Sequence, residues 1–216
     1  MLGELFNNQF VFLSGLVSLV VAITIHEFSH ALAADRLGDP TPRVQGRLTL
    51  NPLAHLDPLG TLMLLIARFG WGKPVVFDPF NLRHPRRDTA IISFAGPLSN
   101  LLLASLLSII LHVLLTTPSA MIFYIIIQPI IVMNVFLAIF NLVPIHPLDG
   151  FKIVEGMLPR EYAIQWRQLE PYGMIFLLFM VFPVFGGNAP VTRVIMPVIQ
   201  FILRLLLPTI GSSGII

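Results

Sequence analysis

Apolar residues dominate long stretches of this chain, and short polar segments rich in proline, glycine or arginine separate them. A membrane-spanning helix needs about 20 consecutive, mostly apolar residues. Three stretches are long enough, so we predict spanning helices at about Asn8–Asp35, Thr89–Leu115 and Ala120–Leu142. Asp88, directly before the second stretch, is predicted to be its N-cap.

Three further apolar stretches are shorter or interrupted. The eleven residues Leu59–Phe69 cannot cross a bilayer, so we expect them to be re-entrant or packed inside the bundle. Near the C-terminus, Tyr172–Phe185 contains Pro183, and Pro190–Leu207 contains Arg193. These two stretches predict one or two additional spans, or helices that lie in the membrane interface.

A polar segment, residues 41–57, connects the first predicted span to the short apolar stretch. Apolar and polar residues alternate at Arg47–Leu50, a pattern typical of a short strand that can pair with an unwound peptide. A short helix is expected at Phe151–Pro159. The predicted fold is an all-α multi-pass membrane protein: a helical bundle of three core spans plus one or two C-terminal spans, with a short membrane-associated β segment.

Composition supports a membrane protein and narrows its chemistry. Of 216 residues, 56% are hydrophobic and 11% charged, with a mean hydropathy of +0.85; soluble domains have about 25% charged residues. The chain has no cysteine, which excludes disulfides, cysteine-ligated zinc and thiol nucleophiles. Only Glu4 and no Lys or Arg precede the first span, so we expect a retained helix and not a signal peptide.

Basic residues are distributed unevenly. Of the 13 lysine and arginine residues, 11 lie between Arg36 and Arg167, mostly in loops at one end of the predicted spans. The positive-inside rule makes that end cytoplasmic and places the N-terminus outside the cell membrane. These residues flank apolar spans and are not combined with a base-stacking motif, so nothing supports nucleic-acid binding.

The first predicted span carries His26, Glu27 and His30 in the pattern His-Glu-x-x-His. Positions i and i+4 share one face of a helix, so both imidazoles can bind one zinc ion. Glu27 is adjacent to a ligand and can accept a proton from the attacking water, as in metal-dependent peptidases. Polar groups are costly in hydrocarbon unless they face protein or water, which favours a site inside the bundle.

A catalytic zinc site needs a third protein ligand and an open position. The predicted topology returns the third span to the end of the bundle where the two histidines lie, and Asp149 comes next at a proline-broken helix end. Gly150 permits a tight turn there. We predict Asp149 as the third ligand of one Zn2+ per chain. His146 competes for this role, and Asp35 is disfavoured because it points to another helix face.

Four further polar residues are candidates for supporting roles. Asn134 and Asn141 share one face of the third predicted span, where amides commonly form interhelical hydrogen bonds. Asn141 can also donate to the oxyanion that forms when water attacks a carbonyl. Asn100 lies near the same end of the second span. His55 either lines the entrance to the site or bonds loop backbone, and we favour the second role slightly.

Three motifs in this order resemble the site-2 protease family of zinc intramembrane metalloproteases, peptidase family M50. They are His26-Glu27-x-x-His30, Gly96-Pro97-x-x-Asn100 and Asn141-x-x-Pro144-x-x-Pro147-x-Asp149-Gly150. The resemblance covers about residues 10–155, and the stretches 46–60 and 81–88 resemble the minimal prokaryotic branch without a PDZ domain. It implies that Asp149 is the third ligand, that Asn141 assists the site, and that the substrates are single-pass membrane proteins.

The predicted function is a zinc-dependent intramembrane endopeptidase that hydrolyses peptide bonds in transmembrane segments, with Glu27 and Asn141 as catalytic residues. We expect a single membrane-embedded peptidase domain over residues 1–216, with a core at 8–155 and C-terminal helices at 172–210. The alternative is a non-enzymatic membrane metal binder or metal transporter, because intramembrane His and Asp also mark ion pathways. An inactive scaffold is disfavoured because the predicted base is present beside the ligands.

Overall fold

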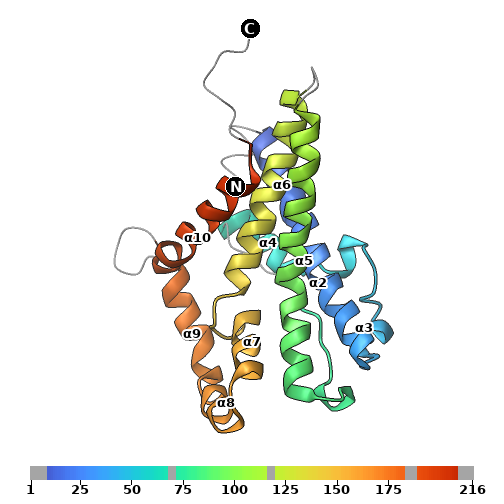
Figure 1. Cartoon of the computed structure of the whole chain (residues 1–216), viewed down its shortest axis with the longest axis vertical. Helices are drawn as coiled ribbons and strands as arrows, with labels where there is room; N and C mark the ends of the chain where they lie inside the picture. The colour runs from blue at the N-terminus through green and yellow to red at the C-terminus, as the bar shows by residue number, and fades with distance from the viewer. Residues whose placement is uncertain (1–8, 68–71, 116–119, 183–188, 209–216) are drawn as a thin grey trace.

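The computed structural model of the chain describes residues 9–67, 72–115, 120–182 and 189–208. Three long helices form its body (Figure 1): α2 (Gln9–Leu37), α5 (Pro85–Leu114) and α6 (Ala120–Asn141). Each comes from one of the three long apolar stretches and is long and apolar enough to cross a membrane. The predicted all-α multi-pass membrane fold is therefore confirmed.

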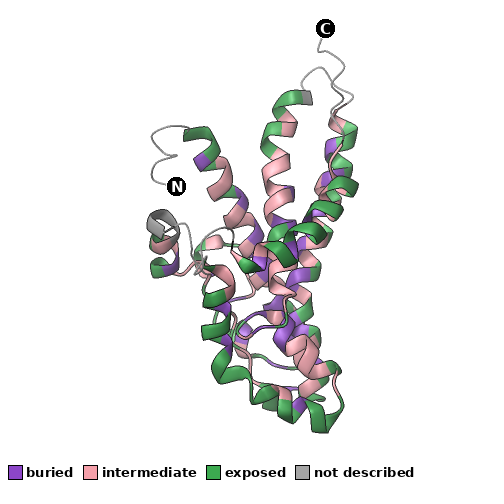
Figure 2. Cartoon of the chain, turned by 90° about the vertical axis from the view of Figure 1, so that its left-hand side faces the viewer, coloured by how far each residue is buried: buried purple, intermediate pink, exposed green. Residues whose placement is uncertain are grey.

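The side chains of this bundle are distributed in the reverse of a soluble protein's pattern. Asn100 of α5 and Asn134 of α6 have no exposed surface, whereas Leu102 and Ile109 of α5 are 61% and 65% exposed. Figure 2 shows exposed residues along the outer sides of the long helices. Outward apolar side chains are stable against lipid, while polar groups inside a span need partners within the protein. The bundle thus presents a lipid-compatible surface around a partly polar interior.

Small side chains allow the three spans to approach closely. Ala22, Ala31 and Ala34 of α2, Ala104 of α5 and Ala138 of α6 are all fully buried. Spanning helices commonly pack through such residues, because close approach of the backbones maximises van der Waals contact where lipid supplies no hydrophobic drive. The close packing brings polar side chains of different spans within hydrogen-bond reach of one another.

The start of α5 differs from the prediction, and the expected N-cap role of Asp88 is wrong. The helix begins at Pro85, and His84 occupies the N-cap position. Proline suits the first helical position because its fixed φ matches the helix and its missing N–H has no helical partner there. Asp88 lies one turn inside the helix, where its carboxylate accepts a hydrogen bond of 2.8 Å from the His84 N–H.

The predicted β segment at Arg47–Leu50 is also wrong. Within the described ranges the structure has no strand, and it has a single isolated bridge, between Leu56 and Gly72. This part of the chain instead forms α3 (Thr41–Val44), the 3-10 turn η1 (Pro52–Ala54) and α4 (Pro58–Ala67). α4 covers residues 59–67 of the predicted short apolar stretch and remains below the length of a span; the last two residues of that stretch lie outside the described residues.

Arg47 explains why this loop does not form a strand. Its buried side chain donates to the backbone carbonyl oxygens of Ala54, Lys73 and Pro74. Burial lowers the pKa of Arg47, and the nearby charge of Glu27 opposes that shift. Because side-chain to backbone bonds hold the loop, it needs no neighbouring strand.

Five shorter elements complete the described chain. They are η2 (Pro79–Asn81), α7 (Asp149–Met157), α8 (Arg160–Arg167), α9 (Glu170–Val181) and α10 (Pro190–Leu206). α9 has 12 residues and α10 has 17, below the roughly 20 that a span requires. α10 packs its buried Val191, Ile195 and Ile199 against α5 and α6. Three helices of the described residues are therefore long enough to span, and for α9 and α10 the interfacial location that we gave as the alternative applies.

Asp39 ties the loop after α2 to the segment before α5. Its fully buried carboxylate accepts hydrogen bonds from the N–H groups of Thr41 (3.0 Å) and Asp78 (2.7 Å), the Thr41 hydroxyl (2.6 Å) and the Asn81 amide (2.8 Å). Burial alone would raise the pKa of Asp39, but these hydrogen bonds outweigh it and hold the pKa below its usual value. One carboxylate thus fixes the 73–84 segment against the end of α2.

Asp39→Ala is expected to destabilise the protein by about 2–3 kcal/mol, because the buried donors lose their acceptor. The melting temperature in detergent micelles should fall. The pKa of Asp39 is lower in the folded than in the unfolded state. Its contribution to the free energy of unfolding is therefore present above the unfolded-state pKa and is lost as the pH falls through the folded-state pKa. The difference between wild type and variant should therefore shrink in acid.

The matched control is Arg43→Ala, which removes an ion pair with Asp35 in which the Arg43 side chain is 66% exposed. Such a pair contributes less than about 1 kcal/mol. Equal losses of stability in Asp39→Ala and Arg43→Ala would show that Asp39 does not hold the loop.

Candidate metal centre

Two histidines of α2 and one aspartate of α7 converge inside the bundle. The Nε2 atoms of His26 and His30 lie 3.1 Å and 3.2 Å from the same oxygen, Asp149 Oδ2. The two imidazole rings are 4.5 Å apart and almost perpendicular, as expected for neighbours one helical turn apart on one face. Both histidines are buried and Asp149 is half-buried. One potential ligand atom from each residue lies within 4.8 Å of the others.

A sharp turn after α6 brings Asp149 to this position. α6 ends at Asn141, and Asp149 is the first residue of α7. At Gly150 a Cβ atom would collide with the carbonyl oxygens of Leu142 and Val143. Glycine is therefore needed where the start of α7 folds back against the end of α6, and this close approach directs Asp149 toward α2.

A chain of hydrogen bonds fixes the orientation of His26. Asn134 Nδ2 donates to the Ile130 carbonyl (2.8 Å), which identifies the other atom of this amide, Oδ1, as the acceptor. Asn100 Nδ2 donates to Asn134 Oδ1 (2.7 Å) and to the Ala22 carbonyl (2.9 Å). Asn100 Oδ1 is then the acceptor facing His26 Nδ1 at 2.7 Å. His26 Nδ1 therefore carries the proton, and Nε2 presents a lone pair.

His30 is oriented in the same way by backbone. Its Nδ1 lies 2.7 Å from the Ile92 carbonyl oxygen, an acceptor that requires a proton on Nδ1. With both rings neutral, as metal ligands require, the lone pairs of both Nε2 atoms face the carboxylate oxygen of Asp149. Three electron-rich atoms at this separation repel one another unless a cation lies between them.

The donor set fits zinc. Two histidine nitrogens and one carboxylate oxygen form a known catalytic zinc ligand set, which leaves one position for water. In a tetrahedral site with zinc–ligand bonds of about 2.0–2.1 Å, ligand atoms lie roughly 3.3 Å apart. The separations of 3.1 Å and 3.2 Å match this value.

Glu27 lies beside His26, and backbone from a distant part of the chain holds it. Its Oε2 accepts a hydrogen bond of 2.9 Å from the Val75 N–H. Val75 belongs to the 73–78 segment, which Arg47 binds through the carbonyls of Lys73 and Pro74. The segment therefore positions a carboxylate next to the three candidate ligands.

Gly96 of α5 leaves the space that the histidines fill. A Cβ atom at this position would lie 2.5 Å from His30 Nε2 and 2.7 Å from His26 Cε1. Real Cβ atoms do not approach ring atoms so closely. The glycine of the Gly-Pro-x-x-Asn motif thus makes room for both rings, and its asparagine, Asn100, binds one of them.

The structure does not bring the other candidate residues into the three-ligand group. The Asn141 amide donates to Leu137 of its own helix at 2.9 Å. His55 is buried with its Nε2 2.7 Å from the Thr49 carbonyl. His146 pairs with Glu170 at 3.4 Å. Asp35, which we disfavoured as a ligand, pairs with Arg43.

Sequence reasoning missed the backbone partners Val75 and Ile92 and the role of Arg47. No pattern in the sequence marks these contacts, because a backbone N–H or carbonyl is available at almost every position. Asn134 is a candidate for interhelical hydrogen bonding on its sequence position, and the structure confirms a bond between spans, to Asn100 of α5.

Comparison with known proteins identifies the family. The model of peptidase family M50 matches residues 117–182, the part of the chain that contains Asn141 and Asp149. A Bacillus subtilis protein, "Putative zinc metalloprotease YwhC", is 40% identical over 178 residues, which cover 77% of this chain and 80% of the relative. The chain belongs to peptidase family M50. It is therefore a zinc metalloprotease, and its three apolar helices make it a membrane protein.

Two more distant relatives support the assignment. "Putative zinc metalloprotease Rip2" of Mycobacterium tuberculosis is 32% identical over 176 residues, which cover 79% of this chain and 67% of the relative. The protein of the same name from Mycolicibacterium smegmatis matches to the same extent. No solved structure matches the chain significantly.

Gly96→Ala is expected to reduce zinc binding at least tenfold, because the added methyl group occupies the space of the His26 and His30 rings. The zinc content of purified protein, measured by atomic emission, should fall well below that of wild type. Gly15→Ala is the matched control, since a Cβ atom at Gly15 of the same bundle meets nothing within 4 Å. Full zinc content in Gly96→Ala would contradict this placement of the metal site.

Proposed function

We propose that this M50 peptidase is an intramembrane endopeptidase that hydrolyses a peptide bond in or near the transmembrane segment of a single-pass membrane protein. The convergence of His26, His30 and Asp149 beside Glu27, within a bundle of spanning helices, carries the proposal. Ionisable groups are costly within spans, and those that occur there usually mark a functional site. A substrate that itself lies in the membrane can reach such a site without leaving the bilayer.

The proposed mechanism assigns one task to each side chain. Zinc held by His26, His30 and Asp149 would polarise the scissile carbonyl and lower the pKa of the attacking water. Glu27 accepts the proton of that water and transfers it to the departing amine. The Val75 N–H, bonded to one Glu27 oxygen, keeps the other oxygen directed to the reacting atoms. Asn141 donates its remaining amide hydrogen to the developing oxyanion.

The proposed orientation rests on charge. Arg36 at the end of α2 and Arg83 and Arg87 at the start of α5 line one cavity of about 450 Å³. Clustered arginines at one end of the spans favour a cytoplasmic location for that end. We therefore propose that the metal centre opens toward the cytoplasm and that the N-terminal end of α2 faces outward.

A cavity of about 790 Å³ beside the 73–78 segment is the proposed binding site for the substrate chain. Val75 lines this cavity and also binds Glu27, so the cavity adjoins the general base. Among the described residues, the N–H groups of Val76 and Phe77 have no hydrogen-bond acceptor. A substrate helix must unwind to expose its carbonyl groups, and the exposed groups can then bond this segment.

The metal transporter considered from the sequence receives no specific support. A transport site needs ligands that bind and release an ion, but it has no need of a carboxylate fixed by backbone next to them. The position of Glu27 against the Val75 N–H favours hydrolysis. The names of the relatives agree with this choice.

Glu27→Gln should abolish cleavage and retain zinc, because glutamine cannot accept the proton but does not disturb the three ligands. The rate should fall by at least about 10³-fold. The assay monitors a single-pass model substrate with Gly or Pro in its span, co-reconstituted in proteoliposomes, while zinc is measured on the same sample. Wild-type turnover by the variant would contradict the assigned base.

Asn141→Leu is expected to lower kcat about 100-fold with little change in KM, because oxyanion stabilisation acts on the transition state. Zinc content and melting temperature should remain close to those of wild type, since the Asn141 amide bonds only to its own helix in the described residues. An unchanged kcat would exclude Asn141 as the oxyanion donor.

A further inference from the structure

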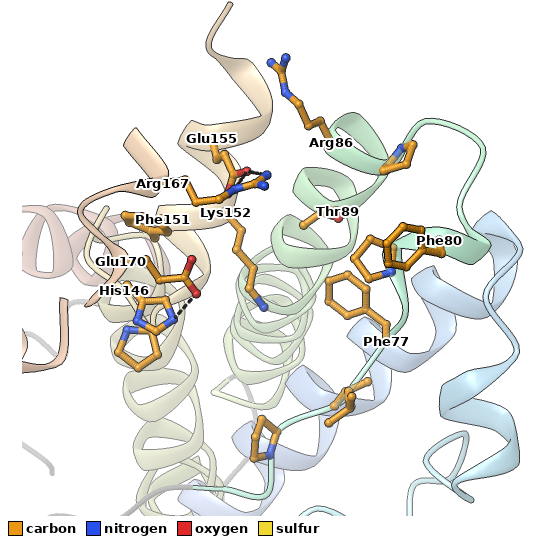
Figure 3. A pocket seen from close by; sticks show the side chains of 16 residues that line it. Phe77, Phe80, Arg86, Thr89, His146, Phe151, Lys152, Glu155, Arg167 and Glu170 are labelled. Atoms are coloured by element: carbon orange, nitrogen blue, oxygen red, sulfur yellow. Dashed lines mark hydrogen bonds and ion pairs between the residues drawn. The ribbon is translucent and has the colours of Figure 1, made fainter. Parts of the chain in front are cut away.

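The proposed substrate cavity has apolar walls that carry several charges (Figure 3). Two phenylalanines, Phe77 and Phe80, lie on one side, and Phe151 of α7 lies on the other. Phe80 is 96% exposed and Val76 58% exposed, so apolar surface remains available beside the N–H groups of Val76 and Phe77, which have no acceptor among the described residues. These features suit an unwound peptide with apolar side chains.

Both carboxylates of the cavity are already paired. Glu155 Oε1 accepts hydrogen bonds from the Arg167 guanidinium, and Glu170 Oε1 lies 3.4 Å from His146 Nε2. Figure 3 shows the two pairs on the side of the cavity formed by α7 and the helices that come after it in the chain. The Glu155–Arg167 pair is neutral, so neither of its members leaves a free charge for a ligand.

Among the described residues, Lys152 is the cation of this cavity that has neither an anionic partner nor a hydrogen-bond acceptor. Its Nζ lies 5.1 Å from the centre of the Phe77 ring, and Figure 3 shows the side chain extending into the cavity. No carboxylate of the described residues lies within 4.0 Å of it. Arg86, the remaining cation of the lining, donates to the Leu158 carbonyl. With three cations and two carboxylates, the cavity has an excess of one positive charge.

Lys152 also lies close to the metal centre along α7. It comes three residues after Asp149, which places both on one face of the helix, about 4.5 Å apart along its axis. An extended peptide advances about 3.3 Å per residue. A substrate side chain that meets the Lys152 ammonium therefore lies within about three residues of the bond at the metal centre.

We propose that this cavity selects peptides with an acidic side chain within about three residues of the scissile bond, and that Lys152 is the residue that recognises it. The inference rests on the proposed endopeptidase function and adds a substrate class to it. The substrate carboxylate pairs with Nζ, while the Phe77 ring supports the lysine from its other side. A basic side chain at the same position is rejected by repulsion.

The test uses internally quenched peptides of one length that carry a single Asp, Asn or Lys within three residues of a central Ala-Gly bond. In one arm, the zinc-loaded wild type in detergent micelles cleaves them. In the other arm, zinc-loaded Glu27→Gln binds labelled versions without cutting them, and fluorescence anisotropy gives Kd. The binding arm therefore tests Lys152 independently of catalysis.

The Asp peptide is expected to bind about tenfold more tightly than the Asn peptide, as for a charge-assisted hydrogen bond in a partly enclosed site. Lys152→Glu, added to Glu27→Gln, should reverse the order and favour the Lys peptide. Lys152→Arg should restore the preference for Asp, which a purely structural role of Lys152 would not predict. Arg160→Glu is the matched control: it makes the same change of charge on an exposed residue outside the cavity lining and should keep the preference.

Equal affinity for the three peptides would overturn the proposal. A preference for Asp that survives Lys152→Glu would also overturn it and assign recognition to Arg86 or Arg167. If Glu27→Gln prefers Asp through Lys152 but the wild type cleaves none of the peptides, acidic recognition stands and the endopeptidase function fails. The two hypotheses therefore have separate outcomes.

Discussion

The structure depends on one constraint: the Nε2 lone pairs of two histidines must face a carboxylate inside a membrane-spanning bundle. The Ile130 carbonyl begins a relay through Asn134 and Asn100 that sets the tautomer of His26, and the Ile92 carbonyl does the same for His30. Because a flip of either amide would place its oxygen against an acceptor, only one orientation of each amide satisfies these bonds. The relay thereby favours one register of the helices, and its hydrogen bonds offset the cost of burying these polar side chains.

Features that depend on local pattern could be predicted from the sequence. Three apolar stretches of span length predicted three spans, and the spacing of His26 and His30 placed both on one helix face. Asp149 could be proposed because two crossings, those of the second and third spans, separate it from the end of the first span, so topology alone returns it to the same end of the bundle. These inferences need only helical periodicity, bilayer thickness and the ligand preferences of zinc.

Features that depend on contacts between distant segments could not be predicted in this way. Alternation at Arg47–Leu50 is typical of a strand, yet the buried Arg47 side chain bonds three carbonyls, and this tertiary contact overrides local propensity. The same limit applies to Asp88, which has the residue type of an N-cap although Pro85 has the stronger claim to the helix start. The bond between Glu27 and the Val75 N–H has no sequence signal, since every non-proline residue offers that donor.

One backbone segment links binding to chemistry. Residues 73–78 are held by Arg47 from one side and by Asp39 through the Asp78 N–H from another. Within this segment Val75 uses its N–H to hold Glu27, while the next two residues line the cavity and their N–H groups have no acceptor among the described residues. A peptide that bonds Val76 or Phe77 therefore restrains the same backbone that positions the general base. Under the proposed function, substrate binding is thus coupled to the alignment of Glu27 through adjacent peptide groups.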